Sequence, residues 1–173
     1  MHNKLQDANA EFWKYLSQTQ KDLILQGDYL INDVIKHGNY TFKDYSFVIF
    51  PYAKAYEGYP KQLFLDLKFI SHLDCISDHL RLGKLLSPFL IERLGDRSLY
   101  KRIQIATSTQ LADKLWDTWK TGRNQIFHYF PHNVKAVSFA EAESIIDQII
   151  QTMVAAFIQL KSQGLQPGSH EKE

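Results

Sequence analysis

The side chains best suited to chemistry lie in one basic and aromatic stretch, residues 119–133, with the sequence WKTGRNQIFHYFPHN. Arg123 and His128 are five positions apart in it, and Asn124 follows the arginine directly. A histidine with a pKa near neutrality can take a proton from a ribose 2′-hydroxyl or give one to a leaving oxygen. A permanently charged arginine can hold the phosphate meanwhile. Such a pair would cleave RNA without a metal ion.

The spacing of the pair leaves a structural interpretation open. Five residues correspond to about 140° of rotation around an α-helix, so Arg123 and His128 do not stack on one face, whereas Asn124 and His128 do. Pro131 ends any helix that contains them. An imidazolium in the last turn of a helix is also stabilised by the helix dipole, by roughly 0.3 to 1 kcal/mol. Taken alone, this stretch favours a helix end over a catalytic site.

A second charged pair changes that balance. Lys54 and Glu57 are three positions apart in the otherwise apolar segment FPYAKAYEGYPK, so they are neighbours on a helix. One interpretation is a salt bridge at the surface. The other is that Glu57 orients His128 or Arg123 across the fold while Lys54 contacts a phosphate. The sequence does not decide between them.

Composition limits the class of protein. The 173 residues are 45% hydrophobic, enough for the core of one domain, which we expect to span residues 1–164 and to be followed by a disordered tail at 165–173. Basic and acidic residues number 20 and 19, so no overall field indicates a nucleic acid or a membrane. A single cysteine, the lack of a long apolar run and the lack of a signal-peptide core predict a cytoplasmic location.

The apolar residues recur with helical spacing, which predicts an all-α fold. We expect a bundle of four main helices. The first precedes Gly38, and the second is a buried helix kinked by Pro51 and Pro60. The third begins near Thr107, where TSTQ resembles a capping box, and continues through Ile126. The fourth begins with a capping box of Ser138 and Glu141 and runs to Gly164.

An irregular basic crossover is predicted between the second and third helices. Residues 81–102 contain Gly83, Pro88 and Gly95, with six basic residues against two acidic ones. The simplest interpretation is a solvated connection between long helices. The same charges could also hold phosphates.

Two further groups of residues are candidates for a zinc site and for contacts with RNA bases. His72, Cys75 and His79 have side chains that can bind zinc, but their spacing matches no recognised zinc motif, so we predict no metal site and no cofactor. Trp119 and Phe127 are predicted core residues, because aromatic side chains at helical spacing usually pack inside. Tyr129 and Phe130, next to His128, are predicted to contact RNA bases or a second copy of the chain.

Taken together, these motifs resemble a known superfamily. A helical bundle whose third helix ends in Arg-x4-6-His, here RNQIFH, resembles the HEPN superfamily of ribonucleases and nucleotide-binding proteins. FPYAKAYEGY followed by GRNQIFHYFP is similar to the HEPN domain of the RnlA-type ribonuclease LS toxins of bacterial toxin-antitoxin systems. The resemblance covers the chain from about Phe42 to the end of the last helix, without the additional N-terminal domains of those toxins.

The resemblance implies an activity and a set of site residues. It implies a metal-independent endoribonuclease that acts as a homodimer, leaves a 2′,3′-cyclic phosphate and is inhibited by a cognate antitoxin protein. Arg123 and His128 match the catalytic pair, Asn124 the polar residue between them and Glu57 the acidic residue of the YEG motif. Lys54 matches a basic residue, and a lysine there lacks the bidentate phosphate contact of an arginine. The alternative is a non-catalytic HEPN-like module that dimerises and binds a nucleotide, RNA or a protein.

Overall fold

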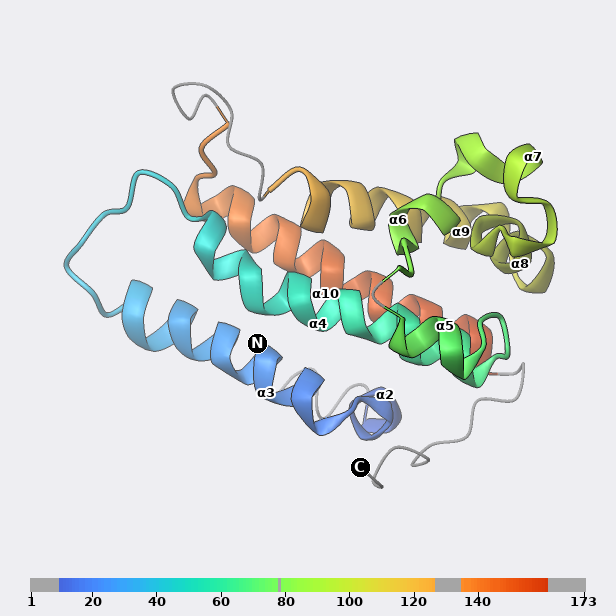
Figure 1. Cartoon of the computed structure of the whole chain (residues 1–173). Helices are drawn as coiled ribbons and strands as arrows, with labels where there is room; N and C mark the ends of the chain where they lie inside the picture. Colours follow the sequence, from blue (N-terminus) through green and yellow to red (C-terminus); the bar gives the residue numbers. More distant parts are fainter. Residues whose placement is uncertain (1–9, 78, 127–134, 162–173) are drawn as a thin grey trace.

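The structure is a computed structural model that describes residues 10–77, 79–126 and 135–161. These residues form helices and no strands, which confirms the predicted all-α class (Figure 1). The longer α-helices are α3 (Gln18–Tyr29), α4 (Ser46–Asp66), α9 (Thr109–Trp119) and α10 (Phe139–Lys161). The shorter ones are α2 (Ala10–Tyr15), α5 (His72–Ile76), α6 (Leu82–Leu85), α7 (Ile91–Leu94) and α8 (Leu99–Ala106). The predicted count of four is not confirmed, because this part of the chain holds nine α-helices.

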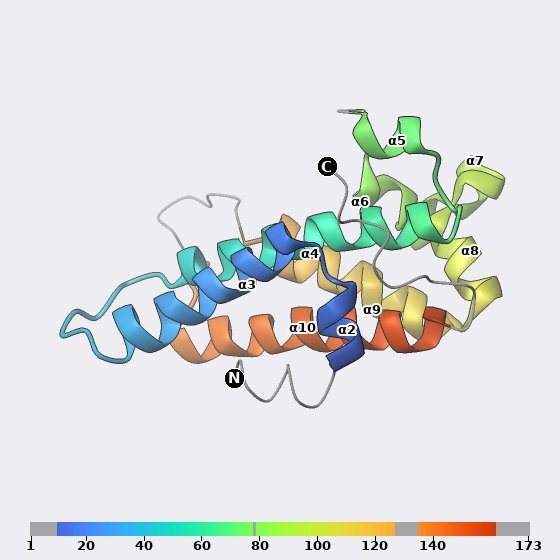
Figure 2. The same cartoon turned by 90° about the horizontal axis from the view of Figure 1, so that it is seen from below.

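The long helices α3, α4 and α10 lie side by side in both views, and α2 is turned across them (Figure 2). The expected first helix is divided after Tyr15, since Ser17 caps a new helix by accepting a hydrogen bond from the Gln20 backbone. Helix α3 then passes through Gly27, which is buried against the ring of Tyr52. A π-helical segment, Leu30–Ile35, completes it before Gly38.

Helix α4 is the buried centre of the fold, as its apolar sequence predicts. It continues through Pro51 and Pro60, each of which leaves one carbonyl without its helical donor. Three of its tyrosine hydroxyls fix it to three other helices. Tyr52 donates to Asp28 of α3 at 2.7 Å, Tyr56 to the Leu115 carbonyl of α9 at 2.8 Å, and Tyr59 to the Met153 carbonyl of α10 at 2.9 Å.

The basic crossover is folded rather than a plain solvated connection. It contains α6, α7 and α8 together with two 3-10 turns, Pro88–Leu90 and Gly95–Arg97. Leu82, Leu86 and Leu99 are buried, which attaches these short elements to the core. Together with α5 they gather around the C-terminal end of α4 (Figures 1 and 2).

The predicted starting residue differs from the structure for α9 and agrees with it for α10. Helix α9 is capped by Ser108 instead of Thr107, because the Thr107 hydroxyl donates to the Ile103 carbonyl at the end of α8. Helix α10 begins with the predicted capping box. The Glu141 amide donates to the Ser138 hydroxyl at 3.3 Å, and the Ser138 amide donates to the Glu141 carboxylate at 2.8 Å.

The remaining predictions concern the C-terminal tail and the absence of a membrane-spanning helix. The tail at 165–173 lies outside the described residues. No helix in the described ranges combines the length and the apolar character needed to cross a membrane.

Candidate active site

Glu57 lies on the part of α4 that is held most firmly. The adjacent Tyr56 and the nearby Tyr59 are fully buried, and their hydroxyls anchor α4 to α9 and α10. Glu57 points out of this anchored stretch, and its side chain is 36% exposed. The carboxylate is therefore held in place by its helix while remaining open to solvent.

Arg123 lies in a π-helical segment, Lys120–Asn124, that continues α9. The Gln125 amide donates to the Lys120 carbonyl at 2.9 Å, which is the hydrogen bond of a π-turn. Thr121 contributes to this turn, because its hydroxyl donates a hydrogen bond to the Asp117 carbonyl at 2.8 Å. Gly122 is buried against α10, where an added Cβ would lie only 2.9 Å from Ile149 Cγ1. Single-turn π segments inside helices are frequent at functional sites.

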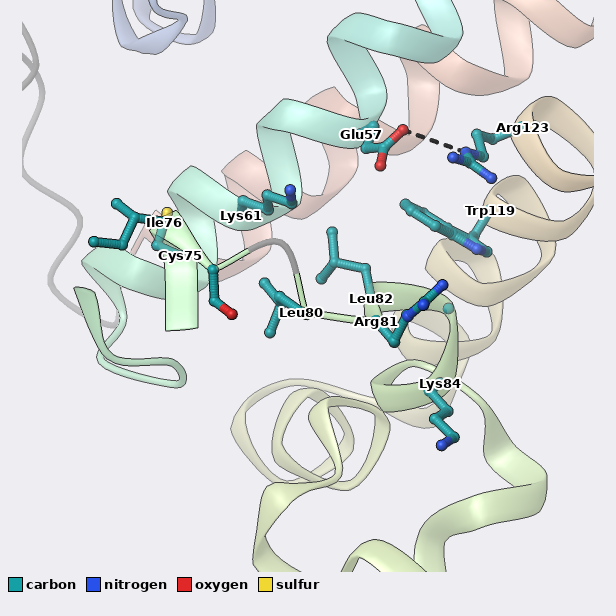
Figure 3. Close-up of a pocket in the computed structure, with 12 residues that line it drawn as sticks. Glu57, Lys61, Cys75, Ile76, Leu80, Arg81, Leu82, Lys84, Trp119 and Arg123 are labelled. Atoms are coloured by element: carbon teal, nitrogen blue, oxygen red, sulfur yellow. Dashed lines mark hydrogen bonds and ion pairs between the residues drawn. The ribbon is translucent and has the colours of Figure 1, made fainter. Parts of the chain in front are cut away.

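Glu57 and Arg123 meet across the two segments. Arg123 Nε donates to Glu57 Oε2 at 3.3 Å, and the guanidinium carbon lies 5.5 Å from the ring centroid of Trp119 (Figure 3). The pair is half-exposed, so it adds only about 0 to 1 kcal/mol to stability. Its main physical effect is to fix the direction of the guanidinium, which still has free N–H groups for a phosphate.

The pair lies at the edge of a pocket of about 760 Å³ between α4, the α5–α6 region and α9 (Figure 3). Its described lining holds one acidic side chain, Glu57, and four basic ones. The basic residues are Lys61, Arg81, Lys84 and Arg123. A pocket of this size lies in the range of small-molecule and cofactor sites, and its charge favours an anion.

Lys54 and Asn124 do not join this pocket. Lys54 is exposed, and its ammonium lies 6.0 Å from the ring centroid of Phe50. Within the described part of the chain it forms no ion pair with Glu57, so the carboxylate is engaged by Arg123 instead. Asn124 is exposed at the end of the π segment and is not among the residues that line the pocket.

The other predicted site residues, His128, Tyr129 and Phe130, lie outside the described residues, as does Phe127, a predicted core residue. The rotation assumed for the Arg123–His128 spacing was that of an α-helix. It does not apply to residues 120–124, where the chain is π-helical.

The zinc-competent residues are divided between a short helix and the segment after it. Ser71 caps α5 and Ser77 ends it, so His79 lies beyond the helix that carries His72 and Cys75. Cys75 lines the Glu57 pocket, whereas His72 lines a second pocket of about 560 Å³. Among the described residues no group of three potential ligands is close enough to hold a metal ion.

Cys75 is expected to react slowly with alkylating reagents. Partial burial raises the pKa of its thiol and disfavours the thiolate, although the nearby Lys61 opposes this effect. At pH 8 a smaller fraction is therefore ionised than in an exposed cysteine, and the rate should rise with pH through the alkaline range. The measurement is the iodoacetamide rate followed by mass spectrometry, with glutathione as the reference. A rate equal to or above that of glutathione would contradict the assignment.

Substitution of Gly83 by alanine is expected to destabilise the wall of the pocket. An added Cβ would lie 2.4 Å from Nε1 of Trp119, a rigid ring that packs against Arg123. Overpacking of this kind costs about 1 to 3 kcal/mol, which should lower the urea midpoint. Gly58→Ala is the matched control, since its Cβ would lie 3.6 Å from Gln20 Nε2, an ordinary contact. We expect it to stabilise α4 by about 0.5 to 1 kcal/mol. Equal shifts in the two variants would refute the close packing at Gly83.

Lys61 and Arg81 are pocket residues that sequence reasoning did not single out. Lys61 could have been predicted from its spacing, because it lies four positions after Glu57 and therefore on the same side of the helix. Arg81 could be recognised only as part of the basic crossover, since nothing in the sequence shows that this segment folds back beside α4 and α9.

Comparison of the chain with protein-family models, curated proteins and solved structures finds no match. The resemblance to the HEPN superfamily therefore depends on the motifs in the sequence. What the chain does is inferred below from those motifs together with the geometry of the site.

Proposed function

We propose that the protein is a metal-independent RNA endonuclease of the HEPN type. The observation that carries this proposal is the ion pair between Glu57 and Arg123, which joins two motifs that are 66 positions apart in the sequence. Each of the two motifs matches a part of the HEPN resemblance. The pair also borders a pocket rich in basic side chains, the charge expected around a bound phosphodiester.

The proposed reaction uses the ribose 2′-hydroxyl as the nucleophile. A general base removes the proton of that hydroxyl, O2′ forms a bond to phosphorus, and the bond from phosphorus to O5′ breaks. A general acid protonates the departing O5′, which leaves a 2′,3′-cyclic phosphate. His128 takes one of these proton-transfer roles, and a homodimer that brings two motifs together would supply the other.

The positive side chains act on the charge of the transition state. Arg123 stabilises the pentavalent phosphoryl group, and Glu57 holds the guanidinium in position from its anchored place on α4. Asn124 and Lys54 are assigned supporting roles, as hydrogen-bond donor to the phosphate and as an outer cation. Tyr129 is assigned a contact with the RNA. A cognate antitoxin that covers this site is part of the same proposal, as is a cytoplasmic location.

A binding module without catalysis is the second candidate. The near balance of charge, 20 basic against 19 acidic residues, favours it, because it provides no strong overall attraction for RNA. Such a module would hold a nucleotide or RNA in the same pocket without turning it over.

Incubation with an unstructured RNA in excess EDTA distinguishes the two candidates. The proposal predicts cleavage at the same rate with and without the chelator. Arg123→Ala protein purified in the same way controls for contaminating ribonucleases. RNA that is bound but remains intact would favour the binding module, and cleavage only after a divalent metal is added would contradict the proposed mechanism.

A further inference from the structure

Three cations of the pocket, Lys61, Arg81 and Lys84, are not used by the proposed reaction. Lys61 lies one helical turn after Glu57 on α4, and Arg81 lies just before α6 in the crossover. Both line the same pocket as Arg123, and in Figure 3 they lie on either side of Leu82. Three segments distant in the sequence, α4, the crossover and the π-helical end of α9, therefore each contribute a positive charge to this pocket.

Among the described residues, the positive charges of this pocket outnumber the negative ones. Its acidic lining residue, Glu57, is engaged by Arg123. Neither Lys61 nor Arg81 forms an ion pair within the described residues, and the ammonium of Lys84 adds a further charge at the rim. Like charges that face one pocket repel one another unless an anion or solvent screens them. The arrangement is thus completed by an anionic ligand.

The positions of the cations favour a chain of phosphates over a single phosphate. Lys61 and Arg81 belong to different segments of the chain, and in Figure 3 they lie apart, on either side of Leu82. The indole of Trp119 is buried and covered by the Arg123 guanidinium, so it offers no free face for stacking a base. What remains is backbone contact, which is the electrostatic and sequence-independent part of nucleic-acid binding.

We propose that this pocket binds the RNA backbone beside the bond that is cut, with Lys61 and Arg81 each contacting a phosphate. The choice of RNA as the ligand rests on the proposed function, while the anion site itself rests on the charges and the cavity. Lys61 and Arg81 are positioning residues in this account. They hold the strand so that the scissile phosphate reaches Arg123.

The test is the salt dependence of binding to a fluorescein-labelled, unstructured ribo-oligonucleotide. It is measured by fluorescence anisotropy in His128→Ala protein, so that the RNA stays intact. The double variant Lys61→Gln, Arg81→Gln should reduce the slope of log K against log salt by about 1.4, since each single-strand phosphate contact contributes about 0.7. At 0.1 M salt the affinity should fall on the order of 10-fold or more.

A control with the same loss of charge is Lys14→Gln, Lys43→Gln. Both lysines are exposed, and neither lines either pocket. This variant should keep the slope of the parent protein to within about 0.3. Circular dichroism of both double variants verifies that the fold is kept.

Five outcomes are informative. A loss of slope confined to the pocket variant supports the inference. Equal losses in the two double variants would show a general attraction and overturn it, as would an absence of RNA binding at low salt, which would leave the pocket to another anion such as an acidic protein. If wild type cleaves RNA and the pocket variant retains full affinity, the inference fails while the proposed function stands. If RNA binds through the pocket but wild type never cleaves it, the proposed function fails and the inference stands.

Discussion

Replacement of His128 by alanine is expected to lower kcat for RNA cleavage by about 10²- to 10⁴-fold, the usual contribution of a general acid or base. The proposed reaction moves two protons, one from the attacking hydroxyl and one to the departing oxygen, and an imidazole is suited to either transfer. Binding of intact RNA should change little, because the imidazole acts in the transition state. Single-turnover kinetics on a labelled oligonucleotide separate the two effects.

His37→Ala is the control for this variant. His37 is exposed, its Nδ1 lies within hydrogen-bond distance of the Asn32 carbonyl, and it does not line the Glu57 pocket. It should retain wild-type kcat. If His128→Ala also retains it, the histidine is a structural residue at a helix end, and catalysis by the Arg-x4-His motif is excluded.

Replacement of Arg123 by alanine is expected to lower kcat by about 10²- to 10³-fold, comparable to the loss of one group that stabilises charge in a transition state. Because the Glu57–Arg123 pair is half-exposed, the free energy of unfolding should fall by no more than about 1 kcal/mol. Arg123→Lys should retain only part of the rate, since an ammonium has neither the planar donor set nor the same stacking on Trp119. Chemical denaturation and single-turnover cleavage measure the two quantities.

Lys120→Ala is the matched control for the arginine. Lys120 belongs to the same π-helical segment, but its ammonium pairs with Asp117 at 3.0 Å, and it does not line the pocket. Its loss should leave kcat within about two-fold of wild type, because a surface ion pair contributes little. Similar losses in the two variants would show that the rate responds to the basic charge of the segment in general and would contradict a specific role for Arg123.

The fold class and the start of α10 were predictable because their causes are local. Apolar spacing predicts α4 and α10, and a capping box requires only residues three positions apart, as at Ser138 and Glu141. The start of α9 was misplaced by one residue because Thr107 and Ser108 are both capable caps. Contact between Thr107 and the preceding helix decides the competition in favour of Ser108.

The irregular parts were not predictable because their causes are tertiary. The division after Tyr15 places its hydroxyl 2.5 Å from Asp66 at the far end of α4, a contact between residues 51 positions apart. The helices of the crossover depend on burial of Leu82 and Leu86. For the crossover the sequence signal was a basic segment interrupted by glycine and proline, and burial of its leucines gives it a defined structure.

In the candidate site, too, the features with local causes were predictable and those with tertiary causes were not. Arg123 and Glu57 could be selected from residue types, but the sequence left open whether Glu57 forms a surface salt bridge or orients Arg123 or His128. The 3.3 Å contact with Arg123 is a result of the structure. The expected partnership of Lys54 with the same site does not agree with the structure, because Lys54 faces Phe50 outside the pocket. The π-helical segment was not predicted, because the spacing argument assumed the 100° rotation per residue of an α-helix. Within this segment Gly122 packs closely against Ile149, a contact between residues distant in the sequence.

The most direct test of the account is the 2′-hydroxyl requirement at the bond that is cut. In excess EDTA, wild-type protein is given an RNA oligonucleotide with one cleavable linkage, or the same oligonucleotide with a single 2′-deoxynucleotide at that linkage, and the products are identified by mass spectrometry. The account predicts that the all-ribose oligonucleotide yields a 2′,3′-cyclic phosphate and that the deoxy oligonucleotide stays intact. Cleavage of the deoxy linkage, or products that carry a 3′-hydroxyl and a 5′-phosphate, would contradict it.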